Sequence, residues 1–142
     1  MIIWAIIINY SMLIGVMIFF VAVVSPSAIS TLEGDYLASF LRAIFPKMFL
    51  LGLVLGIAGN MIIYSINQPF ILFWSGVITL SFAINLLFLT PKINSIRDNL
   101  QLDEGIRETR FKIYHGLSVV LFMLNFVLSL FIVAAQIWPA SL

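Results

Sequence analysis

The polar residues best suited to chemistry in this sequence form one stripe near its C-terminal end. His115 is the only histidine, and histidine can transfer protons, ligate metals or bind haem iron. From it, residues follow at alternating spacings of three and four: Ser118, Phe122, Asn125, Ser129, Ile132 and Gln136. This spacing places them on one face of a helix, because an α-helix repeats every 3.6 residues. Two interpretations stay open: hydrogen bonding between helices, or a polar path or ligand pocket.

A cofactor at His115 is one hypothesis. Two histidines cannot ligate one haem here, so the second axial ligand would be a methionine, and copper would need methionines as well. Of the candidate methionines, only Met48 is expected at the same depth as His115. The alternative is a histidine at the membrane interface that bonds to a neighbouring backbone or to the charged loop. We expect no cofactor, with haem b at His115 as the alternative.

Covalent catalysis finds no support in the sequence. It lacks a Gly-x-Ser-x-Gly elbow, a His-Glu-x-x-His motif, a glycine-rich phosphate loop and any pair of carboxylates within an apolar run. Ser118 lies beside His115 on the same helix, but no acid is placed to orient the pair. No Cys is present, which excludes disulfides and cysteine-ligated metal sites. We therefore predict a protein that is not an enzyme.

The elements that hold these residues follow from the charge pattern. All thirteen charged side chains lie in two windows, Glu33–Lys47 and Lys92–Lys112. The chain is 63% hydrophobic and 9% charged, against about 25% charged in soluble domains. About 20 apolar helical residues cross a bilayer, and the middle uncharged run is long enough for two crossings, separated by the turn formers Asn67, Gln68 and Pro69.

The sequence therefore predicts an all-α, integral membrane protein of one domain, an up-down bundle of four transmembrane helices. We expect the spans near residues 3–24, 46–66, 70–90 and 113–138. The first span has no preceding Lys or Arg and is longer than the 7–15 apolar residues of a signal core, so we expect it to be retained. A helical face of small residues, Gly52, Gly56 and Asn60, predicts close approach of the second span to a neighbour.

The positive charges predict the orientation. Lys and Arg occur only in the loops between spans one and two and between spans three and four, and such loops stay in the cytoplasm. Both termini are therefore expected outside, in a bacterial inner membrane. Trp4, Trp74 and Trp138 would then all lie toward the outer interface, where tryptophan is enriched.

Two features are expected inside the cytoplasmic loops. Apolar residues between Tyr36 and Phe45 fall on one helical face, which predicts a short amphipathic helix lying on the inner leaflet before Pro46 opens the second span. In the other loop, Asp103 with Arg107 and Glu108 with Lys112 have the favourable i,i+4 order, so the last span is expected to begin within the loop.

These loops suggest a binding surface, which we call the inner rim. We expect loop arginines to hold an anionic lipid head group or small anion beside His115, with polar residues of the spans above. The residues predicted for this site are Pro46, Asn85, Pro91, Arg97, Arg110, His115, Ser118 and Asn125. The expected partners are the bilayer and, alternatively, a second copy or a larger membrane complex in which this chain is an accessory subunit. No basic run indicates nucleic acid.

Several short motifs resemble a known family, the small four-span proteins named for transmembrane protein 205. The motifs are Gly15–Phe20 followed by Pro26, Phe45-Pro46, Leu89–Asn94 with Arg97-Asp98, and Arg110-Phe111 leading to His115–Ser118 and Asn125. The resemblance covers nearly the whole chain and implies a four-span fold. Bacterial members are mostly domains of unknown function, whereas animal relatives are associated with drug tolerance and secretion, which implies transport or trafficking.

That family is distantly similar to copper-resistance-D-type membrane proteins and to a four-span protoporphyrinogen oxidase that uses haem. This wider grouping implies a haem or metal ligand at His115. The present sequence departs from the haem-enzyme pattern, because it has one histidine and none in its first span.

Overall fold

A computed structural model describes residues 1–138, and these residues form four long helical rods. The rods span Ile2–Thr31, Gly34–Ser65, Pro69–Asp98 and Glu104–Ile137, and each is long and apolar enough to cross a membrane. Two rods contain a π-helical segment. The elements are α1 (Ile2–Phe19), η1 (Phe20–Val24), α2 (Ser25–Thr31), α3 (Gly34–Ser65), α4 (Pro69–Ile84), η2 (Asn85–Leu89), α5 (Thr90–Asp98) and α6 (Glu104–Ile137).

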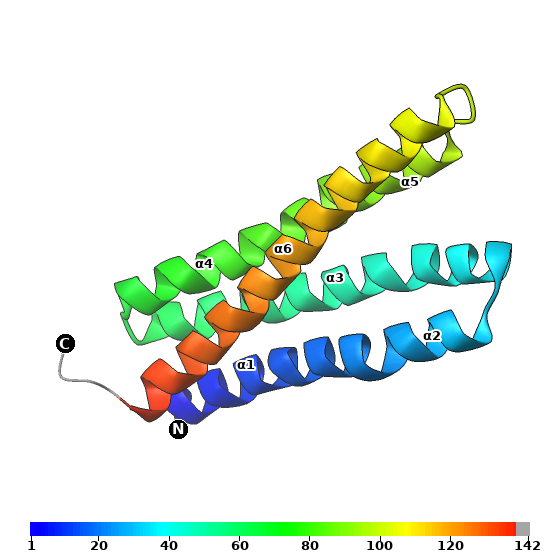
Figure 1. Cartoon of the computed structure of the whole chain (residues 1–142). Helices are drawn as coiled ribbons and strands as arrows, with labels where there is room; N and C mark the ends of the chain where they lie inside the picture. The colour runs from blue at the N-terminus through cyan, green and yellow to red at the C-terminus, as the bar shows by residue number, and fades with distance from the viewer. Residues whose placement is uncertain (139–142) are drawn as a thin grey trace.

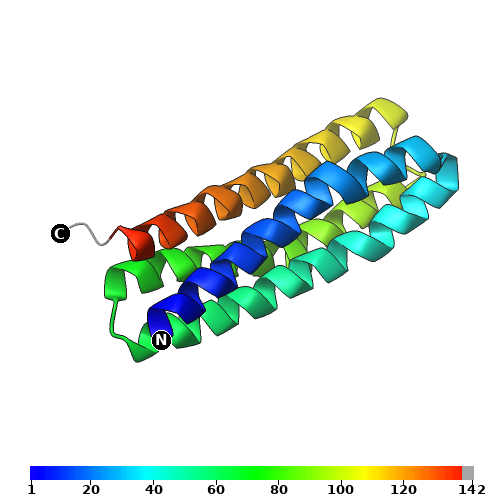
Figure 2. The ribbon, with the colours of Figure 1, turned by 90° about the horizontal axis from the view of Figure 1, so that it is seen from below.

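The rods form an up-down bundle, as predicted. Each rod packs against the next along the chain, and α1 packs against α6 to close the ring (Figures 1 and 2). The turn between α3 and α4 lies where expected: Asn67 has φ 53°, a left-handed conformation that asparagine tolerates, and Pro69 starts α4. The prediction of four spanning helices in one bundle is confirmed.

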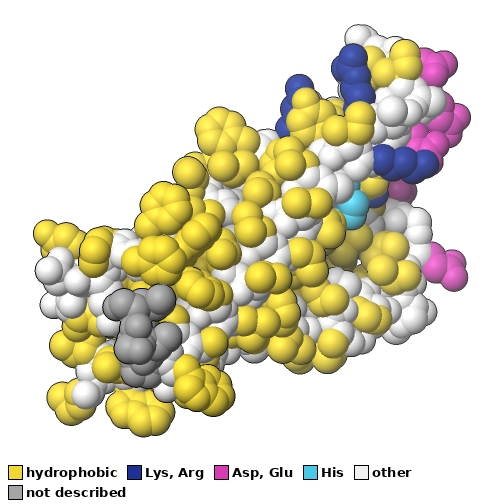
Figure 3. All heavy atoms as spheres, turned by 60° about the vertical axis from the view of Figure 1, so that its left-hand side comes forward, with side chains coloured by type: hydrophobic (Ala, Val, Ile, Leu, Met, Phe, Trp, Pro, Cys, Tyr) yellow, Lys and Arg dark blue, Asp and Glu magenta, His cyan; other side chains and the backbone are white. Residues whose placement is uncertain are grey.

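Charge divides the molecule into two ends. Both chain ends lie at one end of the bundle (Figure 1), and the Lys, Arg, Asp and Glu side chains visible in Figure 3 gather at the other. We call the latter the charged end. Trp4, Trp74 and Trp138 all lie in the half nearer the termini, since they stand at or near the corresponding ends of α1, α4 and α6. The assignment of the charged end to the cytoplasm stays a prediction from the positive charges.

The predicted amphipathic helix before Pro46 is not a separate element, and that prediction was wrong in part. Residues 34–45 are helical, but they continue through Pro46 into the second span as one helix. The apolar side chains on either side of Pro46 explain this continuity. Phe45 packs against Phe20 of the first rod and also against Phe49, one turn farther along α3. Because one neighbour covers both segments, the helix keeps its direction despite the missing proline N–H.

The last rod begins within the charged loop, as predicted. Asp103 caps α6, and its carboxylate accepts hydrogen bonds from the backbone N–H groups of Gly105 and Ile106. The expected pair of Glu108 with Lys112 is formed at 2.7 Å. Asp103 forms no ion pair with Arg107, because its carboxylate satisfies the helix N-terminus instead.

Both π-helical segments precede a proline near the charged end. Pro26 follows η1 and Pro91 follows η2, each at the second residue of the next α-helix. A proline has no N–H to donate and its ring displaces the carbonyl one turn earlier, so a wider turn relieves the clash. At η2 the Thr90 hydroxyl donates to the Asn85 carbonyl at 2.8 Å. The two rods thus stay continuous, while their side chains are re-aimed at this level.

The middle of the bundle contains a layer of hydrogen-bonded polar side chains. The Tyr10 hydroxyl lies 2.5 Å from the Ser75 hydroxyl, which also contacts the Asn60 carbonyl oxygen, and the Asn60 amide donates to Thr79. The Asn9 amide donates to the Leu55 carbonyl. These bonds join α1, α3 and α4 away from water, where they fix one mutual register of the helices.

Candidate functional site

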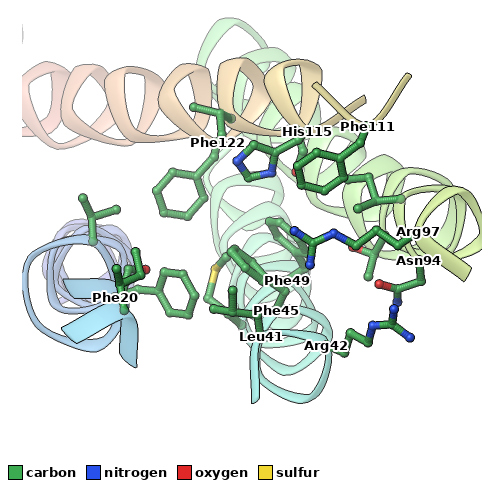
Figure 4. Close-up of a pocket in the computed structure, with 18 of the residues that line it drawn as sticks. Phe20, Leu41, Arg42, Phe45, Phe49, Asn94, Arg97, Phe111, His115 and Phe122 are labelled. Carbon is green, nitrogen blue, oxygen red and sulfur yellow. The ribbon is translucent and has the colours of Figure 1, made fainter. Parts of the chain in front are cut away.

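A pocket of about 550 Å³ lies between the rods at the charged end. Its walls come from all four rods, with side chains of η1 and α2, α3, α5 and α6 facing it (Figure 4). The volume falls within the range of roughly 300–1,000 Å³ typical of small-molecule sites. Most of the lining is apolar, and the polar side chains are few. This is the composition of a site that holds an amphiphilic or apolar molecule in one orientation.

One wall of the pocket carries a stack of a cation and two rings. The guanidinium carbon of Arg97 lies 4.2 Å from the centroid of the Phe111 ring. Phe111 in turn stacks on His115, with ring centroids 5.4 Å apart and planes within 7° of parallel. Figure 4 shows the Arg97 side chain pointing into the space between α3 and α6. The stack holds a positive charge beside the histidine at the edge of an apolar pocket.

The two arginines of the pocket have different partners. Arg42 donates to the Asp98 carboxylate at 2.6 Å, a pair that links α3 to α5. Arg97, one residue before Asp98, forms no ion pair with any side chain among residues 1–138. Asn94, one turn earlier on α5, also lines the pocket and adds an amide beside the arginines. This edge therefore carries one neutralised and one uncompensated cation.

The remainder of the pocket is aromatic and aliphatic. Phe20 of η1 faces Phe45 of α3 with ring centroids 5.2 Å apart, and Phe122 lies across from them on α6 (Figure 4). Phe20 sits at the start of the π-helical segment, so the widened turn aims this ring at the pocket. These rings offer no hydrogen-bond partner, so they suit an apolar part of a ligand.

A short polar chain supports the α6 wall. The Ser118 hydroxyl donates to the Asn85 side-chain oxygen at 2.5 Å, and the Asn85 amide donates to the Ser81 carbonyl. Ser118 lines the pocket, whereas Asn85 is fully buried behind it. The chain fixes α6 against η2 at the level of the pocket, which holds His115 one turn away in position.

The structure brings together part of the predicted inner rim. Arg97, His115 and Ser118 share the pocket wall, and Asn85 supports Ser118. The other four predicted residues do not line it: Pro46, Pro91, Arg110 and Asn125. Arg110 is exposed to the outside of the bundle, although it is only one residue from Phe111. The last of the four, Asn125, is fully buried on α6 with neither amide atom hydrogen-bonded to any residue in 1–138.

Sequence reasoning missed several residues of the pocket. Phe20, Arg42, Asn94 and Phe111 all line it, and none was predicted to bind a ligand. Arg42 and Phe111 could have been found from their position, since each lies in a charged window next to an apolar run. Phe20 could not, because its orientation depends on a π-helical turn that the sequence does not announce.

The pocket also holds the residues required by the cofactor hypothesis. Met48 and Met123 line it together with His115. Met123 is two turns from His115 on the same helix, about 12 Å along the axis at 1.5 Å per residue, and cannot complete an axial pair. Met48 comes from α3 across the pocket and can. No cluster of three or more His, Cys, Asp or Glu side chains suited to a metal ion occurs among the described residues.

Comparisons with known proteins identify the family alone. No curated protein and no solved structure matches the chain. The family model that matches covers residues 8–101, two thirds of the sequence, and describes a domain of unknown function. It gives no support to the resemblance with the transmembrane protein 205 family or with copper-resistance-D-type proteins. The matched segment contains the first three rods and three walls of the pocket, and the chain belongs to the DUF4149 family of domains of unknown function.

Proposed function

We propose that this membrane protein binds the anionic head group of an amphiphilic molecule in the pocket at its charged end. The observation that carries the proposal is Arg97, a cation directed into an apolar pocket without a carboxylate partner among residues 1–138. An uncompensated charge next to the apolar region of a bilayer costs several kcal/mol, on the order of 3. An anionic ligand offsets that cost.

The chemistry of the wall favours a phosphate or carboxylate. A guanidinium presents parallel N–H donors that match two oxygens of either group. Phe111 fixes the plane of the Arg97 guanidinium from one side, which leaves its edge to donate. His115 and Asn94 provide further polar groups within the same pocket. The aromatic and aliphatic walls then accommodate the apolar part of the molecule.

A binding measurement tests the proposal. The purified protein in an uncharged detergent would be titrated with a fluorescent, short-chain phosphatidylglycerol, and binding would be followed by fluorescence anisotropy. Arg97→Gln is expected to weaken binding at least about ten-fold, because a hydrogen bond to a charged group is worth roughly 1.5–3 kcal/mol.

Arg110→Gln is the matched control, since it removes the same charge from an exposed site near the pocket. It is expected to leave the affinity within about two-fold, as surface charges contribute little. Equal weakening by both substitutions would show that surface charge alone attracts the lipid, and would refute a site at Arg97.

A second candidate function is haem binding with His115 and Met48 as axial ligands. The observation in its favour is that the two side chains line one pocket from facing helices, α6 and α3. Arg97 is on the same wall as His115 and would neutralise a haem propionate. A reduced-minus-oxidised absorption spectrum of the purified protein decides this case. A haem spectrum that His115→Ala abolishes would support it, and a spectrum without haem bands in the unsubstituted protein would exclude it.

A further inference from the structure

The pocket is closed on three sides and open on the fourth. At the charged end α2 packs against α3, α3 against α5, and α5 against α6. No Cα atom of η1 or α2 lies within 8 Å of α6, although α1 does pack against α6 nearer the termini. The first and last rods therefore separate from the start of η1 onward. This separation is visible in Figure 1, where α2 and the charged end of α6 diverge.

Apolar, exposed side chains frame the opening. Val21 and Ile29 stand on the edge formed by η1 and α2, and Val119 and Met123 stand on the edge formed by α6. All four line the pocket, yet their side chains remain 48%, 65%, 43% and 43% exposed, respectively. Figure 3 shows the histidine at the surface of this face, beside a hollow bordered by hydrophobic side chains. The opening therefore faces sideways, toward the surrounding lipid.

We propose that the opening between α2 and α6 is a lateral portal through which a lipid of the adjacent leaflet places its acyl chain in the pocket. This inference rests on the proposed head-group site and names its ligand as a membrane lipid instead of a water-soluble anion. The polar and apolar groups are arranged in the order that such a lipid requires. Arg42, Asn94 and Arg97 lie toward the loops, and the apolar frame lies deeper along the rods.

The bilayer sets where the selectivity comes from. Hydrocarbon tails are as apolar as the pocket walls, so moving an acyl chain from the bilayer into the pocket gains little hydrophobic free energy. Discrimination between lipids must therefore come from the head group. A lipid with a net negative charge can pair with the uncompensated Arg97, whereas a zwitterionic lipid brings its own cation and competes poorly.

A photo-crosslinking experiment tests the portal. The full chain would be placed in phosphatidylcholine vesicles that contain a small fraction of phosphatidylglycerol with a diazirine in the middle of its acyl chain. After illumination, mass spectrometry would map the modified residues. The expected crosslinks fall on Val21, Ile29, Val119 and Met123, and Arg97→Gln is expected to reduce their yield by about five-fold or more.

A steric block provides the second arm. Val119→Trp narrows the opening, and Val127→Trp is its control because Val127 is an exposed valine of the same helix that does not line the pocket. Val119→Trp is expected to reduce the crosslinks to the other three frame residues, whereas Val127→Trp is expected to leave them unchanged. Glycerol phosphate, which has no acyl chain, serves as the water-soluble competitor.

The outcomes separate the two proposals. If phosphatidylglycerol binding depends on Arg97 but the frame residues are not crosslinked, the head-group site stands and the portal is refuted. The portal is also refuted if glycerol phosphate binds as tightly as the lipid and displaces it. Equal crosslinking by a phosphatidylcholine probe, unaffected by Arg97→Gln, would show ordinary lipid contact at the bundle surface and would contradict both proposals.

Discussion

Arg97 and Phe111 form the contact on which the candidate site depends: the guanidinium carbon of Arg97 lies 4.2 Å from the centroid of the Phe111 ring. The two residues come from different rods, α5 and α6, and meet across the loop that joins them. A flexible arginine at a membrane surface would normally extend into water. The ring instead holds the cation at the pocket, so the affinity for an anion should depend on an uncharged residue.

The first prediction concerns that ring. Phe111→Leu keeps an apolar side chain but removes the aromatic face, so Arg97 loses an interaction of about 0.5–1 kcal/mol. Binding of the fluorescent phosphatidylglycerol is expected to weaken by about two- to five-fold. Tyr114→Leu is the control, since Tyr114 faces Lys92 at 6.0 Å and does not line the pocket. If both variants bind as tightly as the unsubstituted protein, Phe111 does not position Arg97.

The second prediction concerns the charge next to Arg97. Asp98→Asn removes the carboxylate that pairs with Arg42, so a second cation of the pocket loses its partner. Anionic lipid is expected to bind about two- to five-fold more tightly at low salt, and the gain should vanish near 1 M salt, where the Debye length is about 3 Å. Thermal stability should change by no more than about 1 kcal/mol, because both side chains are substantially exposed.

Glu104→Gln is the control for that experiment. Glu104 is an exposed carboxylate at the start of α6, outside the pocket, and its loss changes the net charge equally. Tighter binding by both variants would assign the effect to the overall charge of this end of the molecule instead of to Arg42.

The four rods and their order could be predicted from the sequence because charge and hydropathy alone determine them. Uncharged runs must be buried in lipid as helices, and the two charged windows must leave it. The ends of the rods were harder to predict. The helices continue into the charged windows, where Asp103 caps α6 and where Pro46 is carried through by packing on both sides. Hydropathy detects the boundary of the bilayer and not the boundary of the helix.

The site was predicted in part, for a related reason. Arg97, His115 and Ser118 were found because polar residues near an apolar run are conspicuous. Their partners on other helices were missed, since a single sequence contains no information on which rods are adjacent at a given depth. Phe20 and Arg42 face the pocket only because η1 re-aims one and the ion pair to Asp98 orients the other. Both effects arise from tertiary structure.

The third prediction tests the close contact between α3 and α4. The small-residue face predicted from Gly52 and Gly56 packs against α4, where a Cβ at Gly52 would collide with the Phe82 ring and one at Gly56 would lie 2.7 Å from the Thr79 hydroxyl. Phe82 is fully buried and cannot move aside freely. Gly52→Ala is therefore expected to destabilise the protein by about 1–3 kcal/mol.

Gly76→Ala is the control for this prediction, because a Cβ at Gly76 meets no atom within 4 Å. In a helix, replacing an unconstrained glycine by alanine stabilises by about 1 kcal/mol or less. Thermal unfolding of the two variants in one detergent should therefore shift in opposite directions. Equal midpoints for the Gly52 variant and the unsubstituted protein would show that the two helices can separate at no cost.

The last prediction concerns Asn125, the polar residue of the α6 stripe without a partner. Its side chain is fully buried, and neither amide atom is hydrogen-bonded to any residue in 1–138. Leaving such a group unsatisfied costs about 1–3 kcal/mol. Asn125→Leu, which has a similar volume and no polar atoms, is therefore expected to stabilise the protein by up to that amount. Asn85→Leu is the matched comparison, because it leaves the Ser118 hydroxyl without its acceptor and should destabilise. Thermal unfolding of both variants decides between two roles for the stripe. If Asn125→Leu destabilises the protein as much as Asn85→Leu does, the amide has a partner such as a buried water, and the stripe forms a hydrated polar path. If it stabilises, hydrogen bonding between helices ends at Ser118, and the polar part of the site is confined to the charged end.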